Sequence, residues 1–158
     1  MNIICDVDGT LTIMGDRRHL ILQYPHRQVP GEVWEQFHAR AMEDKPRPEV
    51  RYMLQEWARN DHVIWLMTGR SEPYRALTRS WLQMHHVPYH HLFMRPEGDY
   101  RSDHVLKEAW YREHLAHQSV LAVLEDRSSV VAMWRSLGLC CLQLEDVISV
   151  QATRSGAE

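Results

Sequence analysis

The sequence predicts a doubly wound α/β fold, in which a parallel sheet is flanked by helices on both faces. Two observations support this prediction. Short apolar runs without polar alternation are typical of strands buried on both faces, and helical patterns lie between them, as a parallel sheet requires. The 158 residues are the length of one ordinary domain. The four or five expected strands are Asn2 to Cys5, His62 to Met67 (ending at Thr68), Leu92 to Met94, Val120 to Leu124 and Leu139 to Leu144.

Helices are expected between these strands, because apolar side chains recur there at the spacing of one buried helix face. Ser71 is placed to cap the second helix and Pro73 would sit in its first turn. Asp103 is a candidate cap for the third helix, and Gly138 would stop the fourth. The apolar faces are Val50, Met53, Leu54 and Trp57; Tyr74, Leu77 and Trp81; Val105, Leu106, Ala109 and Trp110; and Val130, Val131 and Trp134.

One stretch, Ile13 to Pro48, interrupts this alternation between the first strand and the first core helix. It contains several prolines and a short helical pattern near Val33 to Met42. We interpret it as a small helical cap inserted above the sheet, with a long ordered loop as the alternative. The expected organisation is one domain over residues 1–150 with the cap at about 13–48, followed by a flexible polar tail at 151–158.

Composition limits the possible partners and compartments. The formal net charge of -3 provides no general attraction to nucleic acid, so such contact would need a local patch or a few phosphates at a strand end. Three cysteines, two of them adjacent, argue against a disulfide framework and for a reducing compartment. Neither a signal peptide nor an apolar run of about 18 residues is present, so the expected location is cytoplasmic, without membrane contact.

The strongest chemical signal is the pentapeptide Asp6-Val7-Asp8-Gly9-Thr10 directly after the first strand. A carboxylate at the end of a parallel strand points into the crevice where such sheets bind ligands. Of two aspartates two residues apart, one can act as a nucleophile and the other as a proton carrier. Gly9 permits a tight turn whose free N–H groups can bind an anion. The alternative is an ordinary turn rich in Asp and Gly.

Two further signals follow predicted strands. Thr68 and Gly69 offer a hydroxyl and a closely approachable N–H group, which suit a phosphoryl oxygen. Glu125 and Asp126 end the fourth strand, where buried carboxylates need partners. Magnesium, which prefers oxygen ligands, would neutralise them. An internal ion pair with Arg127 is the alternative.

Together, the order acidic pair, hydroxyl, lysine and acidic pair resembles the haloacid dehalogenase (HAD) superfamily of phosphatases over nearly the whole chain. The lysine would be Lys107, although a lysine on a helix ordinarily faces water. The resemblance implies a Rossmann-like, HAD-type sheet and a covalent aspartyl-phosphate on Asp6. It also implies that Asp8 is the general acid and base, a role for which a raised pKa would be suitable. Thr68 and Lys107 would hold the phosphoryl group, and Asp126 would help to bind Mg²⁺.

Three longer stretches resemble, more specifically, the 3′-phosphatase domain of bacteriophage polynucleotide kinase. They are Asp6 to Asp16 with Arg17, Arg95 to Glu108, and Glu125 to Gly138. This resemblance implies removal of 3′-phosphates from DNA or RNA ends. No GxxxxGK[ST] phosphate loop appears, so a phosphatase without a kinase half is expected.

The resemblance defines a set of site residues, with two departures from the family pattern. Glu125 stands where the family more often has Asp, which leaves its share in metal binding open, and the insertion looks longer. Two rival functions are a phosphatase for free nucleotides or small metabolites and a non-catalytic phosphate-binding protein. The expected residues are Asp6, Asp8, Thr68, Arg70 and Lys107 for catalysis; Gly69, Arg95, Asp99 and Arg127 for substrate binding; Asp6, Asp8, Asp126 and Glu125 for the metal; and Arg101 and Asp103 at the site or its rim.

Two groups of residues, the histidines near Pro88 and the tryptophans, allow more than one interpretation. His85, His86, His90 and His91 have a spacing that could bind a metal, but magnesium prefers oxygen ligands, so a surface loop is favoured. The tryptophans are mostly expected in the core. Trp34, in the insertion, could instead stack on a nucleobase.

Overall fold

Five parallel strands form the central sheet, in the order β5-β4-β1-β6-β7. This confirms the predicted α/β fold class. The computed structural model describes residues 1–24 and 29–145. The expected domain end at 150 and the tail at 151–158 lie outside the described residues, so the domain limits stay a prediction. The strands are β1 (Asn2–Cys5), β4 (Val63–Ser71), β5 (His91–Arg95), β6 (Val120–Glu125) and β7 (Cys141–Gln143).

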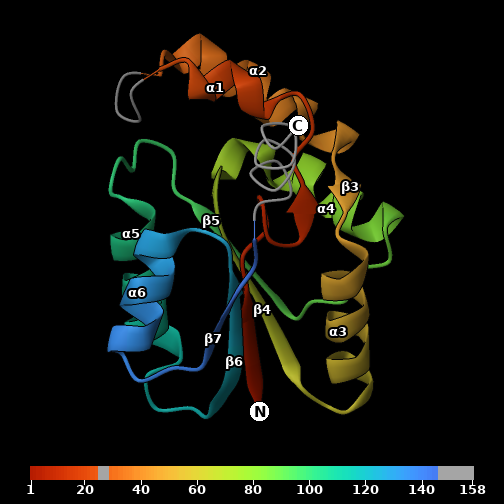
Figure 1. Ribbon diagram of the computed structural model, residues 1–158, viewed down its shortest axis with the longest axis vertical. Helices are drawn as coiled ribbons and strands as arrows, with labels where there is room; N and C mark the ends of the chain where they lie inside the picture. Colours follow the sequence, from red (N-terminus) through yellow and green to blue (C-terminus); the bar gives the residue numbers. More distant parts are fainter. Residues whose placement is uncertain (25–28, 146–158) are drawn as a thin grey trace, which may run out of the picture.

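Helices cover both faces of the sheet (Figure 1), and each face has its own apolar core. Because successive side chains of a strand point to opposite faces, Ile3 and Cys5 of β1 belong to one core and Ile4 to the other. This explains why the strands read as continuous apolar runs. One face carries α3 (Pro48–Arg59) and α4 (Arg75–Met84); the other carries α5 (Asp103–His114) and α6 (Ser128–Ser136).

The second strand and its following helix differ from the sequence-based expectation. β4 continues to Ser71 instead of ending at Thr68, and its pairing with β5 is irregular between these two residues. Ser71 then precedes a 3-10 turn, η2 (Glu72–Tyr74), and makes no side-chain capping bond. The helix α4 begins only at Arg75. The irregular pairing lets the strand extend past the point where the apolar run stops.

The third core helix also begins differently from the prediction. Asp103 is the first residue of α5, not its cap, and the capping position belongs to Ser102, which makes no side-chain capping bond. The Asp103 carboxylate is instead bound by two arginine side chains, Arg95 and Arg127. These contacts are long-range, so the local sequence pattern could not distinguish them from a capping role.

The insertion after β1 forms a helical cap above the carboxyl ends of the strands (Figure 1). The helical pattern predicted near Val33 to Met42 is confirmed as an α-helix followed by a 3-10 turn. A short antiparallel pair, Thr12 with Pro46 and Ile13 with Lys45, closes the base of the insertion. The elements are β2 (Thr12–Ile13), α1 (Arg18–Leu22), α2 (Gly31–Ala39), η1 (Arg40–Glu43) and β3 (Lys45–Pro46).

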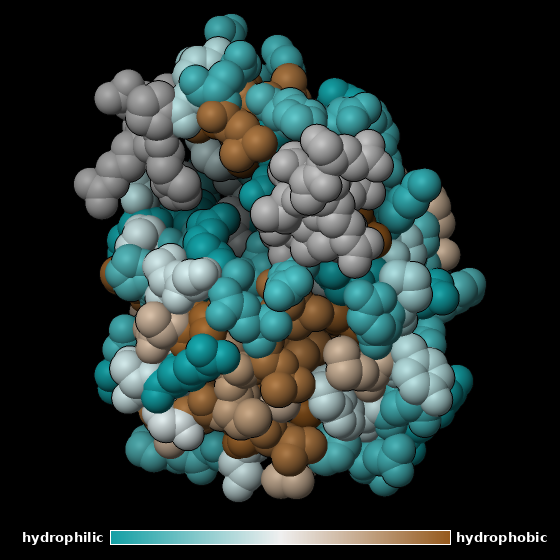
Figure 2. Space-filling model, viewed as in Figure 1, coloured by the Kyte–Doolittle hydropathy of each residue, from teal (hydrophilic) through white to brown (hydrophobic). Residues whose placement is uncertain are grey.

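The face of the molecule seen in Figure 2 carries a concentration of apolar side chains. In Figure 2 brown side chains gather between α6 and α3, around the edge strand β7, whereas the cap region is mostly teal. Leu121 of β6 and Leu142 of β7 are both exposed. None of the helices within the described part of the chain is long and apolar enough to cross a membrane.

The α3 interface gives a test of the core. Leu54 of α3 is fully buried in the core on this face of the sheet, so Leu54→Ala should lower the free energy of unfolding by about 2–5 kcal/mol through lost burial and a residual cavity. Tyr52→Ala, on the exposed side of the same helix, should change it by less than about 0.5 kcal/mol. Urea unfolding curves would measure both. Equal effects would contradict the packing described for α3.

Candidate active site

The candidate site lies where β1, β4 and β6 end at the same edge of the sheet. Asp6 directly follows β1, and its N–H group donates to the carbonyl of Leu124 at 3.0 Å, which ties it to β6. Thr68 of β4 is fully buried, and its Oγ1 accepts a hydrogen bond from the N–H group of Arg70 at 3.2 Å. Glu125 is the last residue of β6. Parallel strands that share an edge therefore bring the predicted motifs together.

Lys107 of α5 points into this edge and is only 2% exposed. Its Nζ donates to Asp6 Oδ1 at 2.6 Å and to Glu125 Oε2 at 2.7 Å. Burial alone would lower the pKa of Lys107, but the two carboxylates outweigh burial and raise it. The side chain is therefore an ammonium ion at neutral pH. The general expectation that a helical lysine faces water is wrong here, because Lys107 lies buried beside Asp6 and Glu125. Its role in catalysis stays a prediction.

Three carboxylates form an acidic trio beside Lys107: Asp6, Glu125 and Asp126 each offer an oxygen, all within 4.8 Å of one another. Burial raises the pKa of Asp6 to about 7; Lys107 opposes this shift and Glu125 adds to it. One ammonium group does not neutralise three carboxylates, so the trio favours a divalent cation. An oxygen-only ligand set is the kind that magnesium prefers. The Glu125 side chain belongs to the trio, and its share in metal binding stays a prediction.

The loop after β1 is shaped around Asp126. Gly9 has a φ of +89°, and a Cβ atom at this position would overlap the Asp126 carboxylate. Thr10 Oγ1 donates to Asp126 Oδ1 at 3.3 Å. Arg47, which the sequence did not single out, donates to the carbonyls of Gly9 at 2.9 Å and Thr10 at 3.0 Å. The glycine is required here both by its backbone conformation and by the close approach of Asp126.

Asp8 lies apart from the acidic trio and contacts two arginines. Its carboxylate accepts from Arg70 Nη2 at 2.7 Å and from Arg17 Nη2 at 2.5 Å. Burial would raise the pKa of Asp8, but Arg70 and Arg17 outweigh it and hold this pKa far below its usual range. A raised pKa was expected to suit Asp8 as general acid and base, whereas its pKa is lowered. The side chain of Asp8, also suggested as a metal ligand, faces the arginines instead.

A second acid, Asp44, completes this arrangement and was missed by the sequence analysis. Arg17 donates to Asp44 through Nε at 2.8 Å and through Nη2 at 2.5 Å, and both side chains are almost fully buried. The Arg17 guanidinium also lies 4.2 Å from the ring centroid of Phe37 in α2. Asp44 lies outside every motif and 27 residues from Arg17, so no local signal could identify it.

The rim of the site is organised around Asp103. Its carboxylate binds Arg95 and Arg127 at once. A Cβ atom at Gly69 would come within 2.9 Å of Asp103 Oδ1, so only glycine allows β4 to pass this close. Arg127 keeps 47% of its side chain exposed. Three of the predicted substrate-binding positions, Gly69, Arg95 and Arg127, therefore meet at Asp103.

Asp99 and Arg101 form a second, more exposed pair in the same loop. Arg101 Nη2 donates to Asp99 Oδ2 at 2.6 Å, and this contact lowers the pKa of Asp99 to about 2. Arg95 Nη1 donates to the carbonyls of Asp99 at 3.1 Å and Arg101 at 2.7 Å. Both residues thus support the rim loop around Arg95, and a direct substrate contact of Asp99 stays a prediction.

The four histidines near Pro88 have separate local contacts. His90 Nδ1 accepts from the N–H group of Ile64 at 2.9 Å, and His91 stacks on Trp65 with ring centroids 3.7 Å apart. Within the described ranges, the metal-type cluster that does form is the acidic trio.

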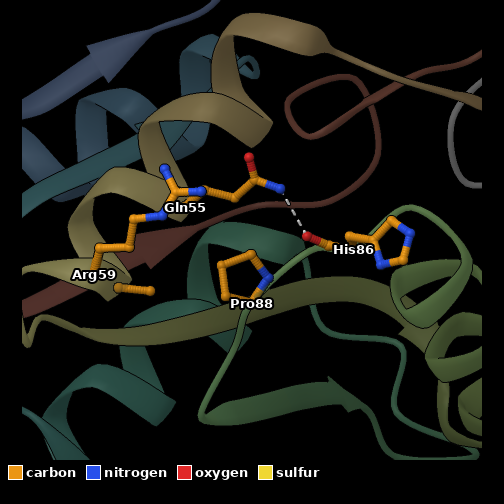
Figure 3. Close-up of a pocket in the computed structure, with 5 residues that line it drawn as sticks. Gln55, Arg59, His86 and Pro88 are labelled. Atoms are coloured by element: carbon orange, nitrogen blue, oxygen red, sulfur yellow. Dashed lines mark hydrogen bonds between the residues drawn. The ribbon is translucent and has the colours of Figure 1, made fainter.

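A pocket also lies near these histidines, between α3 and the segment before β5 (Figure 3). In it, Gln55 Nε2 donates to the carbonyl of His86 at 3.0 Å, and Arg59 and Pro88 line the sides. Arg59 precedes β4 and Pro88 precedes β5, so the pocket is at the amino ends of these strands. It is therefore separate from the acidic trio at the carboxyl ends.

Residues 1–147 match the sequence model of the polynucleotide kinase PNKP phosphatase domain. The chain is 29% identical, over 138 residues, to a predicted bifunctional polynucleotide kinase/RNA ligase of Autographa californica nuclear polyhedrosis virus. That alignment covers 85% of this chain and 18% of the viral protein. The chain therefore spans a small part of this relative.

Solved structures show the same relationship. A chain of the Pnkp1/Rnl/Hen1 RNA repair complex superimposes with a TM-score of 0.76 and 29% identity, covering 91% of this chain and 42% of the other. A hydrolase from Streptococcus pneumoniae superimposes with a TM-score of 0.59 over 98% of this chain and 97% of its own length. At 15% identity, the hydrolase supports the fold alone.

The buried lysine gives a test of the site's electrostatics. Lys107→Met keeps the approximate volume but leaves Asp6 and Glu125 without their shared cation, which should lower the free energy of unfolding by about 3–5 kcal/mol at neutral pH. Lys45→Met, at an exposed position of β3, is the control and should be nearly neutral. Chemical unfolding without divalent ions would measure both. A Lys107→Met protein as stable as the control would contradict this arrangement.

Proposed function

We propose, since the chain belongs to the PNKP phosphatase-domain family and is a phosphatase, that it removes 3′-phosphates from DNA or RNA ends with the help of Mg²⁺. The single observation that carries this proposal is the meeting of Asp6, Glu125, Asp126 and Lys107 at the carboxyl edge of the sheet. This arrangement provides a buried carboxylate nucleophile together with positive charge and room for a cation's oxygen ligands.

The acidic trio fits a magnesium ion, because its donors are all carboxylate oxygens within 4.8 Å of one another. Asp6, Asp126 and Glu125 would hold the ion, with Gly9 leaving space for the Asp126 carboxylate. When bound, the ion supplies the positive charge that allows a carboxylate and a phosphate to approach each other.

The reaction itself is assigned to this chain's own side chains. Lys107 orients the Asp6 carboxylate, which attacks phosphorus and forms an aspartyl-phosphate while the bond to the sugar oxygen breaks. Asp8 gives a proton to that oxygen. Water then attacks phosphorus, the Asp6–phosphorus bond breaks and Asp8 takes a proton from the water. Thr68 and Lys107 stabilise charge on the phosphoryl oxygens.

The low pKa of Asp8 bears on this scheme. An ionised Asp8 suits the second step, in which it accepts a proton from water. As a donor it must first be protonated, which requires weaker contacts with Arg17 and Arg70 than those described above. A bound phosphate would compete for both arginines. We therefore propose that substrate binding prepares Asp8 for the first step.

A nucleic-acid end is favoured over a free metabolite by the rim and by the relatives. At the rim, Arg95 and Arg127 share the single carboxylate of Asp103, which leaves excess positive charge beside the half-exposed Arg127. In a protein with a net charge of -3, this is the local positive charge that a neighbouring backbone phosphate requires. The relatives with 29% identity are a predicted polynucleotide kinase/RNA ligase and a component of an RNA repair complex. A phosphatase for free nucleotides would use the same core, so substrate comparison decides between them.

The nucleophile is tested by substitution. Asp6→Asn should abolish phosphate release, with a fall in kcat of at least about a thousandfold, because an amide does not attack phosphorus as a carboxylate does. Asp61→Asn, at an exposed position at the amino edge of the sheet, should retain normal turnover. Near-normal activity of Asp6→Asn in a phosphate-release assay would exclude covalent catalysis at Asp6.

The substrate is tested with matched esters. Phosphate release should be faster from 3′-phosphorylated DNA or RNA oligonucleotides than from 5′-phosphorylated oligonucleotides or free mononucleotides, by about tenfold or more in kcat/KM. Chelation by EDTA should stop release from every ester, and added Mg²⁺ should restore it. Faster turnover of mononucleotides would favour the metabolite alternative, and release without any metal would contradict the magnesium assignment.

A further inference from the structure

The cap presents a group of aromatic rings next to the site. Trp34 and His38 lie one turn apart on α2, with ring centroids 5.8 Å apart and an interplanar angle of 21°. His38 also contacts Tyr74, with ring centroids 4.7 Å apart. Tyr74 belongs to η2, which directly follows β4 and its Thr68-Gly69-Arg70 segment. The three rings therefore form a continuous wall from the cap to the core.

His38 is the buried member of the aromatic wall. Its side chain is 6% exposed, and its Nδ1 is buried without a hydrogen-bond partner within the described part of the protein. Burial lowers the pKa of His38 to about 4, and Arg70 and Arg17 act in the same direction against the opposing effect of Asp8. The ring is therefore neutral at pH 7, and it supports the more accessible rings of Trp34 and Tyr74.

Contacts of α2 and the position of η2 connect the aromatic wall to the residues around Asp8. Phe37, the neighbour of His38 on α2, lies against Arg17, which donates to Asp8. Tyr74 follows the Thr68-Gly69-Arg70 segment of β4, and Arg70 also donates to Asp8. In the proposed reaction Asp8 meets the leaving sugar oxygen, and the group that follows this oxygen is the nucleoside.

We propose that the half-buried rings of Trp34 and Tyr74 form the subsite for the terminal nucleoside, whose base packs against them while the buried ring of His38 supports both. The inference rests on the proposed function and adds the recognition of the base to it. Stacking on aromatic side chains tolerates different bases, because every base has a π-face. The wall therefore selects for a nucleoside over a small aliphatic alcohol without reading sequence.

The experiment compares two 3′-phosphorylated oligonucleotides, one with a normal terminal base and one in which a stable tetrahydrofuran sugar replaces the terminal nucleoside. For the unmodified protein, kcat/KM should be about 5-fold to 150-fold higher on the substrate with the base, the range expected for one stacked base. In Trp34→Ala and in Tyr74→Ala this ratio should fall towards one. Trp34→Phe should retain most of it, since a ring remains.

Tyr52→Ala, at an exposed position of α3, is the matched control and should keep the ratio of the unmodified protein. An unmodified protein that does not distinguish the two substrates would overturn the subsite, and so would Trp34→Ala and Tyr74→Ala variants that keep the full ratio while losing activity equally on both. An unmodified protein that releases no phosphate from either oligonucleotide would instead overturn the proposed function, and the subsite with it.

Discussion

The buried contact of Lys107 with Asp6 and Glu125 is the interaction on which the candidate site depends. Asp6 follows β1 and Glu125 ends β6, and these strands are neighbours in the sheet, with Cys5 beside Leu124. Two carboxylates in such a place would repel each other and lose solvation. The ammonium group of Lys107 makes their proximity possible. It leaves the acidic trio with excess negative charge, which is the condition for binding a divalent cation.

A second set of charges connects the cap to the core. Asp8 and Arg70 come from the core, whereas Arg17 and Asp44 come from the cap. The same Asp44 accepts, through its backbone carbonyl, the indole N–H of Trp81 in α4 at 2.9 Å. The position of the cap is thus determined by buried ion pairs as well as by apolar packing. Since Asp8 belongs to this set, the geometry of the cap and the protonation of the proposed proton carrier are physically linked.

The proposed nucleoside subsite is shared between the cap and the core. The cap holds one part of the aromatic wall, Trp34 and His38, while Tyr74 and the rim arginines belong to the core. A substrate would therefore contact both parts of the protein. The relatives are much longer than this chain, and the phosphatase fold accounts for 18% of one and 42% of another. The same phosphatase unit is therefore found within larger nucleic-acid-processing proteins.

The sequence by itself determined the features that are local along the chain. Apolar runs predicted the strands, helical spacing predicted the core helices, and acids and hydroxyls at the strand ends identified Asp6, Thr68, Glu125 and Asp126. Family resemblance was needed to select Lys107, because its spacing alone indicated a solvent-facing side chain. The tertiary structure decided the inward direction of Lys107, the ion pair of Arg17 with Asp44, the low pKa of Asp8 and the burial of His38. These features depend on charges and rings brought together from distant segments, such as the 101 residues between Asp6 and Lys107, and no local pattern encodes such distances.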